Sequence, residues 1–584
     1  MTKPPSNSAN AKPKQPGIMS LLKPYRALVI LLILFALISN GINLWLPKII
    51  ANGIDAFGKH TFVYSSIIIK FAVAVLVIFV FTYLQSIIQT YASEKVARDL
   101  RTKLSDKISK QSYAYIENAN PSRLLTNLTA DVDSIKMFIS QAIVSIASSL
   151  FIIIGASVLL LTINWKLALA VIAIIPIIGG TFFYVIKKVR ALFKISREVL
   201  DTLNRVISES IMGSALIRVV NSQQPEYDKF LVSNTRARDL GLSILRLFAG
   251  LIPVIIFTSN MAYLAILVLG GHFVIINAMS LGDFAAFNSY LALLIFPILV
   301  IGFMSNVIAQ ATASYQRITG VIDAPELVET GQITVPLKGA IEIEDLSISY
   351  GQKPALKHLS LNIQPGQKIA IIGPTAAGKT QLLYALTGLV KPTSGSIKYD
   401  SRPMDEYNSE AFQSQVGLVF QDSIVFNMSI RENIAFSDTV TDESLEKAIE
   451  TAELKDFVDS LPDKLSTVVS ERGSSLSGGQ KQRIMLARAL AVNPKILFLD
   501  DFTARVDTNT EKKILANVQK NYPGLTLLSV TQKIASVEHF DQIILLMEGE
   551  IVASGTHTEL MQKSPEYIQI FNSQQSTSNY ELQS

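Results

Sequence analysis

The chain has 584 residues, more than one hydrophobic core usually organises, and 49% of them are hydrophobic against 17% charged. The mean hydropathy of +0.36 excludes an ordinary soluble protein of this size, and the apolar residues gather in roughly the first 320 positions. The absence of cysteine excludes disulfides, thiolate metal sites and cysteine nucleophiles. A net charge of +5 is compatible with nucleic-acid binding, but the location of the charge argues against it.

The first half of the chain contains six apolar runs. Residues 1–17 precede them; this segment is rich in Pro, Ser, Asn and Lys and lacks the apolar core of a cleavable signal, so we expect a disordered cytoplasmic lead. The runs, each long enough for a membrane helix, are Ala27–Pro47, Phe71–Ser93, Met137–Trp165, Leu167–Ile186, Leu247–Gly282 and Phe284–Gln316. Six such runs favour membrane spans over buried helices of a soluble protein, and we expect a transmembrane domain over residues 18–322.

Basic residues predict the orientation of these spans. The segments between the second and third spans and between the fourth and fifth each carry at least eight Lys or Arg, whereas the loop after the first span has only Lys48 and Lys59. We therefore expect a multi-pass protein of the cytoplasmic (inner) membrane with both termini and the C-terminal domain in the cytoplasm. A less charged stretch in each long segment, Arg123–Ala130 and Glu209–Ile217, is suited to lying across a partner domain.

The spans also bear on the substrate. They have no ionisable residue at mid-depth, which argues against an ion relay or a voltage sensor. Their amide and aromatic residues, such as Asn40, Asn260 and Phe257, suit an amphipathic substrate. Lipid contact and helix packing explain these residues equally well.

The second half of the chain predicts an α/β domain. A linker over residues 323–338 leads to alternating strand and helix patterns over 339–572, and residues 573–584 are expected to form a disordered tail. The apolar strand Gln367–Ile372 runs into Gly373-Pro374-Thr375-Ala376-Ala377-Gly378-Lys379-Thr380, ahead of a helical stretch. This is the phosphate loop G-x-x-x-x-G-K-[ST] in its required context, in which backbone N–H groups close around phosphates. We expect Lys379 to reach the β- and γ-phosphates and Thr380 to bind Mg²⁺.

Two further segments complete the nucleotide-binding pattern. The apolar strand Ile496–Leu499 ends in Asp500, which is placed to hold Mg²⁺. The segment Leu476-Ser477-Gly478-Gly479-Gln480 precedes a helical stretch and offers N–H groups and a hydroxyl to a phosphate. The chain's own phosphate loop already holds one nucleotide, so this second anion site implies a second copy of the domain.

With these motifs the sequence resembles the ABC transporter superfamily, and specifically exporter half-transporters, from about residue 18 to 570. The resemblance implies an ATPase coupled to transport, with ATP and Mg²⁺ as cofactors, in which two nucleotides lie between the phosphate loop of one copy and the signature, residues 476–480, of the other. It assigns Tyr350 to stacking on the base, Gln421 to Mg²⁺ and to sensing the membrane domain, and Asp507 to the D-loop. The short sequences Asn164-Trp165-Lys166, Leu281-Gly282-Asp283 and Glu471-Arg472-Gly473 also match exporters.

Three departures from the family pattern cluster at the hydrolytic centre. Asp501 stands where the family has the glutamate that polarises water, Gln532 replaces the switch histidine, and the D-loop reads Ala504-Arg505-Val506-Asp507 instead of S-A-L-D. Replacing Glu by Asp withdraws the carboxylate by roughly 1.5 Å, and a misplacement of about 1 Å can cost on the order of 10²-fold. Gln532 can donate a hydrogen bond but cannot relay a proton. With its intact signature, the chain resembles the degenerate-site subunit of bacterial heterodimeric exporters.

The leading hypothesis is one half of an exporter for drugs, lipids or other amphipathic compounds. Its expected partners are a second half-transporter, with a heterodimer favoured over a homodimer, and membrane lipid, but no nucleic acid. A homodimeric lipid flippase or peptide exporter stays open, as does an ATP-gated regulator or channel, although no regulatory insertion separates the domains. The lack of cysteine excludes an exporter with a cysteine protease domain, and the six spans exclude soluble ABC ATPases.

Overall fold

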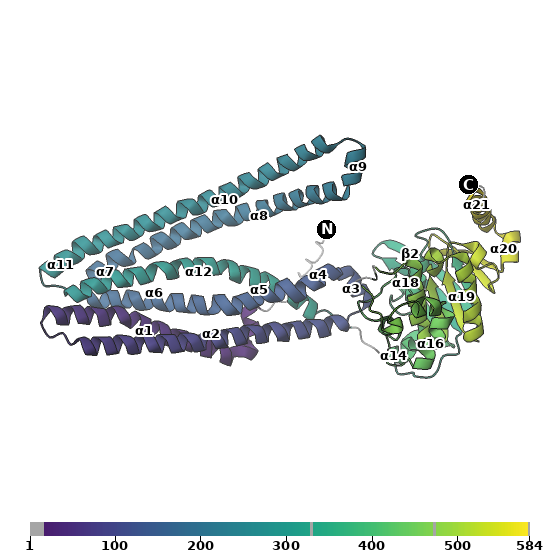
Figure 1. The fold of residues 1–584 in the computed structure, drawn as a ribbon, viewed down its shortest axis with the longest axis horizontal. Coiled ribbons are helices and arrows are strands. Elements are labelled where there is room, and N and C mark those ends of the chain that lie inside the picture. Colours follow the sequence, from purple (N-terminus) through teal and green to yellow (C-terminus); the bar gives the residue numbers. More distant parts are fainter. Residues whose placement is uncertain (1–16, 327–330, 471–472, 474, 582–584) are drawn as a thin grey trace, which may run out of the picture. The chain divides into compact units, whose positions relative to one another are not determined.

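The computed structural model describes residues 17–326, 331–470, 473 and 475–581, and its contacts divide the chain into two units. The helical unit comprises Met1–Lys110 and Ala119–Pro325, and the α/β unit comprises Gln111–Asn118 and Glu326–Ser584 (Figure 1). The predicted fold class, six long apolar helices followed by an α/β domain, is confirmed. The expected disordered lead, apart from Gly17, lies outside the described residues.

Six helical stretches in the described part of the chain are long and apolar enough to cross a membrane. They are Ile18–Gly58, Tyr64–Ser109, Pro121–Ile163, Trp165–Met212, Gln223–Ile275 and Leu281–Ile322. Each overlaps one predicted apolar run, although the predicted run Leu247–Gly282 extends past the fifth stretch into the start of the sixth. Their elements are η1 (Ile18–Tyr25), α1 (Arg26–Gly58), α2 (Tyr64–Ser109), α4 (Pro121–Thr126), η2 (Asn127–Asp131), α5 (Val132–Met137), η3 (Phe138–Ala142), α6 (Ile143–Ile163), α7 (Trp165–Ile172), α8 (Ile174–Met212), α9 (Ser214–Val219), α10 (Gln223–Ala265), η4 (Ile266–Gly270), α11 (Gly271–Ile275) and α12 (Leu281–Ile322).

Two of the exporter-like short sequences have clear structural causes. The Asn164 side chain caps α7 by accepting hydrogen bonds from the amides of Lys166 and Leu167 at 3.1 and 3.2 Å. Gly282 lies so close to α1 that a Cβ there would sit 2.1 Å from the Ala51 carbonyl oxygen, so no larger residue fits. Its neighbour Asp283 pairs with Lys48 of α1 at 2.9 Å. Both sequences therefore fix contacts where helices begin.

The predicted docking stretch Arg123–Ala130 belongs to the helical unit. It forms α4 and most of η2, and Leu124 and Asn127 are buried within the unit. The next residue, Asp131, is 2% exposed and accepts hydrogen bonds from Ser314 and Arg317 of α12, both at 2.9 Å. These contacts hold the stretch against α12. The segment that joins the α/β unit instead is Gln111–Asn118, which forms most of α3 (Tyr113–Ala119).

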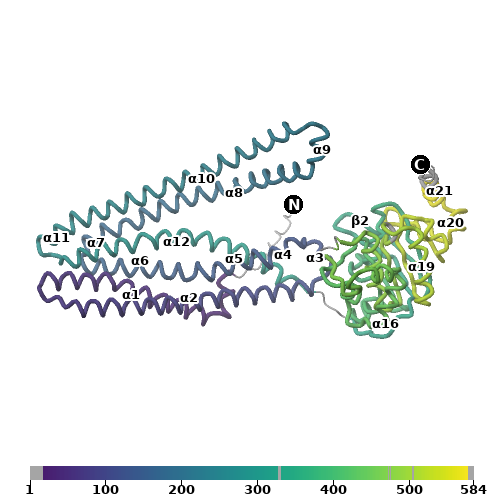
Figure 2. The backbone as a smooth tube through the Cα atoms, viewed as in Figure 1, coloured from purple at the N-terminus to yellow at the C-terminus, as the bar shows by residue number. Residues whose placement is uncertain are grey.

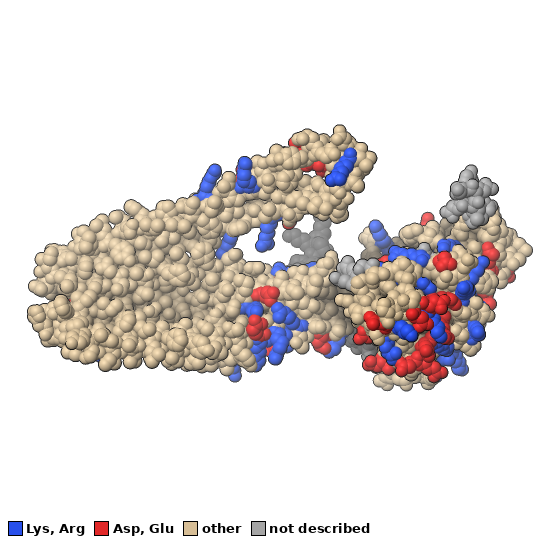
Figure 3. All heavy atoms as spheres, viewed as in Figure 1, with Lys and Arg blue, Asp and Glu red and all other residues tan. Residues whose placement is uncertain are grey.

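Helices α8 and α10 form a long hairpin closed by α9. Figures 1 and 2 show this hairpin diverging from α6 and α12 toward the α9 end of the helical unit. Figure 3 shows Lys and Arg side chains along the space where it diverges, whereas the face shown at the opposite end of the helical unit is almost free of charge. Apolar side chains at the tip of the hairpin are exposed, at 80% for Met212, 66% for Leu216 and 83% for Val219.

The described residues of the α/β unit form two sheets. A four-stranded sheet has the order β2-β1-β4-β5, and a six-stranded sheet has the order β10-β9-β3-β8-β7-β6, with parallel pairing from β9 to β6. The strands are β1 (Ile341–Tyr350), β2 (Lys353–Ile363), β3 (Lys368–Ile372), β4 (Ser394–Tyr399), β5 (Arg402–Pro403), β6 (Val416–Val419), β7 (Ile496–Asp500), β8 (Thr526–Val530), β9 (Gln542–Met547) and β10 (Glu550–Gly555). In such a parallel sheet, ligands bind beyond the carboxyl ends of the strands.

The remaining helical elements surround these sheets. They are α13 (Lys379–Leu386), η5 (Met404–Glu406), α14 (Ser409–Gln413), α15 (Ile430–Ile434), α16 (Asp442–Thr451), α17 (Lys455–Asp459), η6 (Lys464–Ser466), α18 (Gly478–Ala491), η8 (Phe502–Arg505), α19 (Thr508–Asn521), η9 (Ile534–Ser536), α20 (His557–Lys563) and α21 (Pro565–Glu581). The last helix corrects the expected disordered tail of residues 573–584, because α21 continues to Glu581 and Gln574 is hydrogen-bonded to the loop after β8. Residues 582–584 lie outside the described residues.

Candidate functional site

The phosphate loop connects the buried strand β3 to α13, and two glycines make its path possible. Gly373 has a φ of +154°, and a Cβ there would lie 2.0 Å from the Leu546 carbonyl oxygen. Gly378, the N-cap of α13, has a φ of +97°, and its Cβ would lie 2.6 Å from the Ala355 carbonyl oxygen. Only glycine avoids both the contact and the strain. The loop therefore presents backbone N–H groups at the start of α13, where anions bind.

Lys379 places a cation within this loop. Its Nζ donates hydrogen bonds to the carbonyl oxygens of Gly373 and Pro374, each at 2.8 Å, and the residue is 9% exposed. Burial lowers the pKa of its ammonium group, and the nearby carboxylates of Asp501 and Asp500 oppose this shift. The arrangement holds a partly desolvated positive charge where phosphate oxygens are expected.

The predicted site residues meet at one cavity of about 510 Å³. Thr375 to Thr380 of the phosphate loop line it, together with Gln421, Asp500, Asp501 and Gln532. These residues come from four separate segments that the parallel sheet brings to one edge. Gly373 and Pro374 are not part of the cavity lining, and their carbonyl oxygens accept hydrogen bonds from Lys379.

Asp500 and Thr380 fit a magnesium ion. Asp500 ends β7, is 1% exposed, and its Oδ2 atom has no hydrogen-bond partner. A hydrogen bond with Thr380 lowers the pKa of the carboxyl group, but burial is the larger influence and raises it overall. A buried carboxylate oxygen without a partner, beside a hydroxyl and with Gln421 lining the same cavity, matches the oxygen ligands that Mg²⁺ prefers. When bound, the metal would neutralise charge on the β- and γ-phosphates.

Asp501 directly follows Asp500, and its backbone is held in place. Its φ is +49°, and its amide donates to the Val530 carbonyl oxygen at 2.9 Å, which ties it to the end of β8. Burial raises the pKa of its carboxyl group, with Lys379 and Lys533 opposing the shift. The carboxylate thus faces the cavity on a short side chain whose backbone has little freedom to move.

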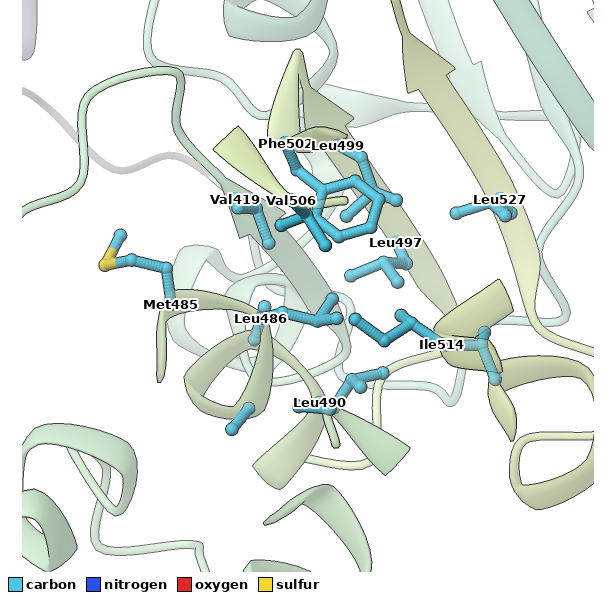
Figure 4. Close-up of a cluster of buried hydrophobic side chains, with 14 of the residues drawn as sticks. Val419, Met485, Leu486, Leu490, Leu497, Leu499, Phe502, Val506, Ile514 and Leu527 are labelled. Atoms are coloured by element: carbon cyan, nitrogen blue, oxygen red, sulfur yellow. The ribbon is translucent and has the colours of Figure 1, made fainter. Parts of the chain in front are cut away.

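A tightly packed core supports the ends of the strands. Figure 4 shows Leu497 and Leu499 of β7 packing with Phe502 and Val506 of the following turn and with Leu486 of α18. Phe502 is 1% exposed and Val506 is 6% exposed. The turn after Asp501 is therefore anchored on both sides of the D-loop, while Asp507 caps α19 by accepting a hydrogen bond from the Thr510 amide at 3.0 Å.

The signature segment lies outside the lining of this cavity. Ser477 is the N-cap of α18, where its Oγ accepts from the Gln480 amide at 3.2 Å and its amide donates to Gln480 Oε1 at 2.8 Å. A Cβ on Gly478 would lie 3.1 Å from Arg505 of the D-loop. The helix start is thus preformed, with Leu476 packed against the core behind it. Of the expected Glu471-Arg472-Gly473, only Gly473 lies within the described residues.

Comparison with known proteins agrees with this architecture. The family model of the ABC transporter transmembrane region matches residues 29–298, and that of the ABC transporter matches residues 356–504. The chain is 31% identical over 565 residues to the uncharacterized ABC transporter ATP-binding protein YfiB of Bacillus subtilis, covering 95% of this chain and 98% of the relative.

The chain is an ABC exporter half-transporter. It is also similar to the multidrug resistance-like ATP-binding protein MdlA of Buchnera aphidicola, with 30% identity over 94% of this chain and 96% of the relative. The ATP-dependent lipid A-core flippase of Syntrophus aciditrophicus is 29% identical over 84% of this chain and 82% of the relative. The half-transporter therefore binds ATP through its α/β unit, couples ATP hydrolysis to transport, and requires a second half.

Tyr350 lies at the edge of the nucleotide cavity of the half-transporter. Its ring is exposed, at 46%, and its hydroxyl donates to Gln381, which lines the cavity directly after the phosphate loop. Burial of the hydroxyl raises its pKa, and the charge of Glu117 in α3 adds to the shift. An exposed aromatic face beside the phosphate loop is compatible with the predicted base stacking.

The structure also shows an aromatic contact that the sequence did not reveal. The ring of Tyr113 in α3 lies 5.5 Å from that of Tyr384 in α13, which in turn lies 6.0 Å from Phe420. Phe420 directly precedes Gln421. The three rings connect α3 to both the phosphate-loop helix and the Q-loop glutamine. No pattern in the sequence marks Tyr113, because its partners follow it by about 270 residues or more.

Proposed function

We propose that this half-transporter exports amphipathic compounds and that its own hydrolytic site is slow. The observation that carries the proposal is the composition of the cavity. The residues that we assign to the phosphates and Mg²⁺, Thr375 to Thr380, Gln421 and Asp500, line the cavity. Asp501 and Gln532 line it too, at the positions that the resemblance gives to the catalytic glutamate and the switch histidine. This site is thus expected to bind MgATP but to hydrolyse it slowly.

The geometry of Asp501 supports the weak-base part of this proposal. The side chain is one methylene shorter than that of glutamate, and the hydrogen bond from the Asp501 amide to the Val530 carbonyl oxygen restrains the backbone from moving to compensate. Gln532 can hold a γ-phosphate oxygen by a hydrogen bond, but its amide does not titrate and so cannot relay a proton. A misplacement of about 1 Å at such a centre costs on the order of 10²-fold in rate.

We infer that the partner is a different half-transporter with a competent catalytic pair. The signature of this chain is preformed at the start of α18 yet lies outside its own cavity, so it is available to a nucleotide held by another chain. The exposed apolar tip formed by Met212, Leu216 and Val219 offers a second surface for that chain. In this assembly, the predicted stretch Glu209–Ile217 would dock on the partner.

The names of two relatives suggest the kind of substrate, and the basic residues suggest the orientation in the membrane. One relative is named for multidrug resistance and another for lipid A-core flipping, and both substrates combine apolar and polar parts. An amphipathic drug or lipid is therefore the proposed cargo. The gathering of Lys and Arg at one end of the helical unit supports placing that end, both termini and the ATPase domain in the cytoplasm (Figure 3).

Hydrolysis by the purified chain, with and without its partner, tests the proposal. The chain alone should bind MgATP and turn over slowly, and the partner should raise turnover strongly because the signature at Ser477–Gln480 completes the competent site. Replacing the partner's catalytic glutamate should reduce turnover by about 10²- to 10⁴-fold, whereas Asp501→Asn should have far less effect. Brisk hydrolysis by the lone chain, abolished by Asp501→Asn, would contradict the proposal and favour a homodimer.

A further inference from the structure

The C-terminal helix α21 docks on the α/β unit through one face. Tyr567 is fully buried, and Ile570 and Phe571 pack against the same core. The Tyr567 hydroxyl also lies 2.7 Å from His557 Nδ1, and the Phe571 ring lies 5.3 Å from the His557 ring. Positions 567, 570, 571 and 574 follow the spacing i, i+3, i+4, i+7 of a single helix face. The next residue on the docked face is therefore Gln574.

The amide of Gln574 bonds at both ends to the loop that follows β8. Its Oε1 atom accepts a hydrogen bond from the Ile534 amide at 3.0 Å, and its Nε2 atom donates to the Gln532 carbonyl oxygen at 2.6 Å. A glutamine side chain is suited to this double contact because it carries one acceptor and two donors on the same plane. The side chain of Gln532 lines the nucleotide cavity, so Gln574 holds the backbone of a cavity residue.

On the other side of Gln532, the loop is held by Thr531. This residue is 1% exposed, its amide donates to the Ile371 carbonyl oxygen of β3 at 3.2 Å, and its Oγ1 accepts from the Lys533 amide at 3.1 Å. Thr531 thus ties the loop to the strand that leads into the phosphate loop. Gln532 lies between two anchors, one in the sheet and one in the C-terminal helix.

We propose that Gln574 is a positioning residue for Gln532, by which the C-terminal helix sets how the switch glutamine faces the γ-phosphate. The inference rests on the proposed role of Gln532 in contacting that phosphate. Fixing the peptide on either side of Gln532 limits the positions that its side chain amide can reach, and small displacements at such a group have large effects on phosphate contacts.

Amide hydrogen exchange in the nucleotide-free full-length chain tests the contact itself. Two truncations provide a matched pair: a chain ending at Ser573 loses Gln574, whereas a chain ending at Gln575 keeps it. Exchange at the Ile534 amide should rise by about tenfold or more in Gln574→Ala and in the chain ending at Ser573, and should stay at the full-length level in the chain ending at Gln575. Equal exchange in all four proteins would overturn the inference.

Nucleotide discrimination tests the positioning role. Gln532→Ala and Gln574→Ala should each lower the preference of the full-length chain for MgATP over MgADP by several-fold, because only ATP has the γ-phosphate. The double variant should lose no more than Gln532→Ala alone, since Gln574 acts through Gln532. A purely structural role of Gln574 would instead lower thermal stability without changing the ratio of the two affinities.

The two possible failures are distinguishable. An unchanged ATP preference in Gln532→Ala would refute the proposed role of Gln532 at the γ-phosphate, and the positioning role with it. A reduced preference in Gln532→Ala but not in Gln574→Ala would refute the positioning role alone, and so would fully additive losses in the double variant.

Discussion

Lys379 donates hydrogen bonds to two carbonyl groups of its own loop, and phosphate oxygens are stronger acceptors for the same ammonium group. We predict that Lys379→Ala weakens MgATP binding by about 10- to 100-fold, because hydrogen bonds to charged groups contribute about 1.5–3 kcal/mol. Titration of the full-length chain with a fluorescent ATP analogue measures the loss.

Lys357 provides the control for this prediction. It also lines the cavity, but its Nζ pairs with Glu550 at 3.2 Å instead of with the phosphate loop. Lys357→Ala should change the affinity far less than Lys379→Ala. Equal losses in the two variants would mean that general positive charge, and not the position of Lys379, accounts for binding.

Glu511 makes stability depend on pH. It lies in the first turn of α19 and is 1% exposed, and burial raises the pKa of its carboxyl group above the ordinary 4.5, with Ser536, Lys533 and Lys512 opposing the shift. A raised pKa means that the folded chain holds the proton more tightly than the unfolded chain. The contribution of Glu511 to the stability of the folded chain is therefore complete below pH 4.5, and it is lost as the pH rises through the raised pKa.

We predict that Glu511→Gln flattens this pH dependence and raises the unfolding temperature near neutral pH by about 2–4 °C, the shift expected for about 1 kcal/mol in a domain of this size. Scanning fluorimetry of the full-length chain between pH 4.5 and 7.5 measures it. Glu559→Gln is the matched control, because hydrogen bonds from Thr556 lower the pKa of Glu559. Glu559 therefore stabilises the folded chain at higher pH, and this contribution is lost as the pH falls. Similar pH profiles in both variants would contradict the assignment.

At the scale of elements, α3 is the part of the first half of the chain that packs within the α/β unit. The ring contacts from Tyr113 through Tyr384 to Phe420 connect it to the phosphate-loop helix and to the residue before Gln421. Edge-on ring pairs of this kind contribute about 0.5–1.5 kcal/mol beyond the area they bury. The three rings thus hold α3 in a defined position beside the nucleotide cavity.

We predict that Tyr113→Ala reduces the stimulation of ATP hydrolysis by substrate several-fold while basal hydrolysis changes little, because the cavity residues themselves are untouched. The assembled transporter in lipid vesicles, assayed with and without an amphipathic substrate, provides the measurement. Tyr113→Phe keeps the ring and should behave like the unaltered chain. If Tyr113→Ala retains full stimulation, coupling does not depend on this contact.

At the scale of the whole molecule, the distribution of charge predicts the direction of transport. Basic residues gather at one end of the helical unit (Figure 3), and we propose that this end is cytoplasmic. Substrate should therefore move outward from the cytoplasm or the inner leaflet. Inside-out vesicles containing both halves should accumulate an amphipathic dye when ATP is added outside.

Vesicles carrying Lys379→Ala in this chain and the corresponding change in its partner are the control for that experiment and should not accumulate dye. Accumulation only in right-side-out cells would reverse the proposed direction. The result does not depend on which half hydrolyses ATP faster. It therefore tests the direction of transport separately from the proposed difference in hydrolysis rate between the two halves.

The sequence by itself determined the features that depend on neighbours along the chain. Six apolar runs are enough to predict six spans, because length and apolarity alone decide whether a helix can cross a membrane. The phosphate loop was equally predictable, since Gly373 to Thr380 are contiguous and their function lies largely in the backbone path that glycine permits. The resemblance to exporters added Gln421, Asp501 and Gln532, and all three line the same cavity.

Only the tertiary structure decided which distant segments meet. Arg123–Ala130 packs in the helical unit beside the ion pair between Asp131 and Arg317, whereas Gln111–Asn118 packs in the α/β unit. Residues 573–584 have the composition of a disordered tail, yet Gln574 meets a loop forty residues earlier through two hydrogen bonds. The physical reason is the same in both cases: a polar side chain has no preferred partner until folding brings a buried charge or an unpaired backbone group to it.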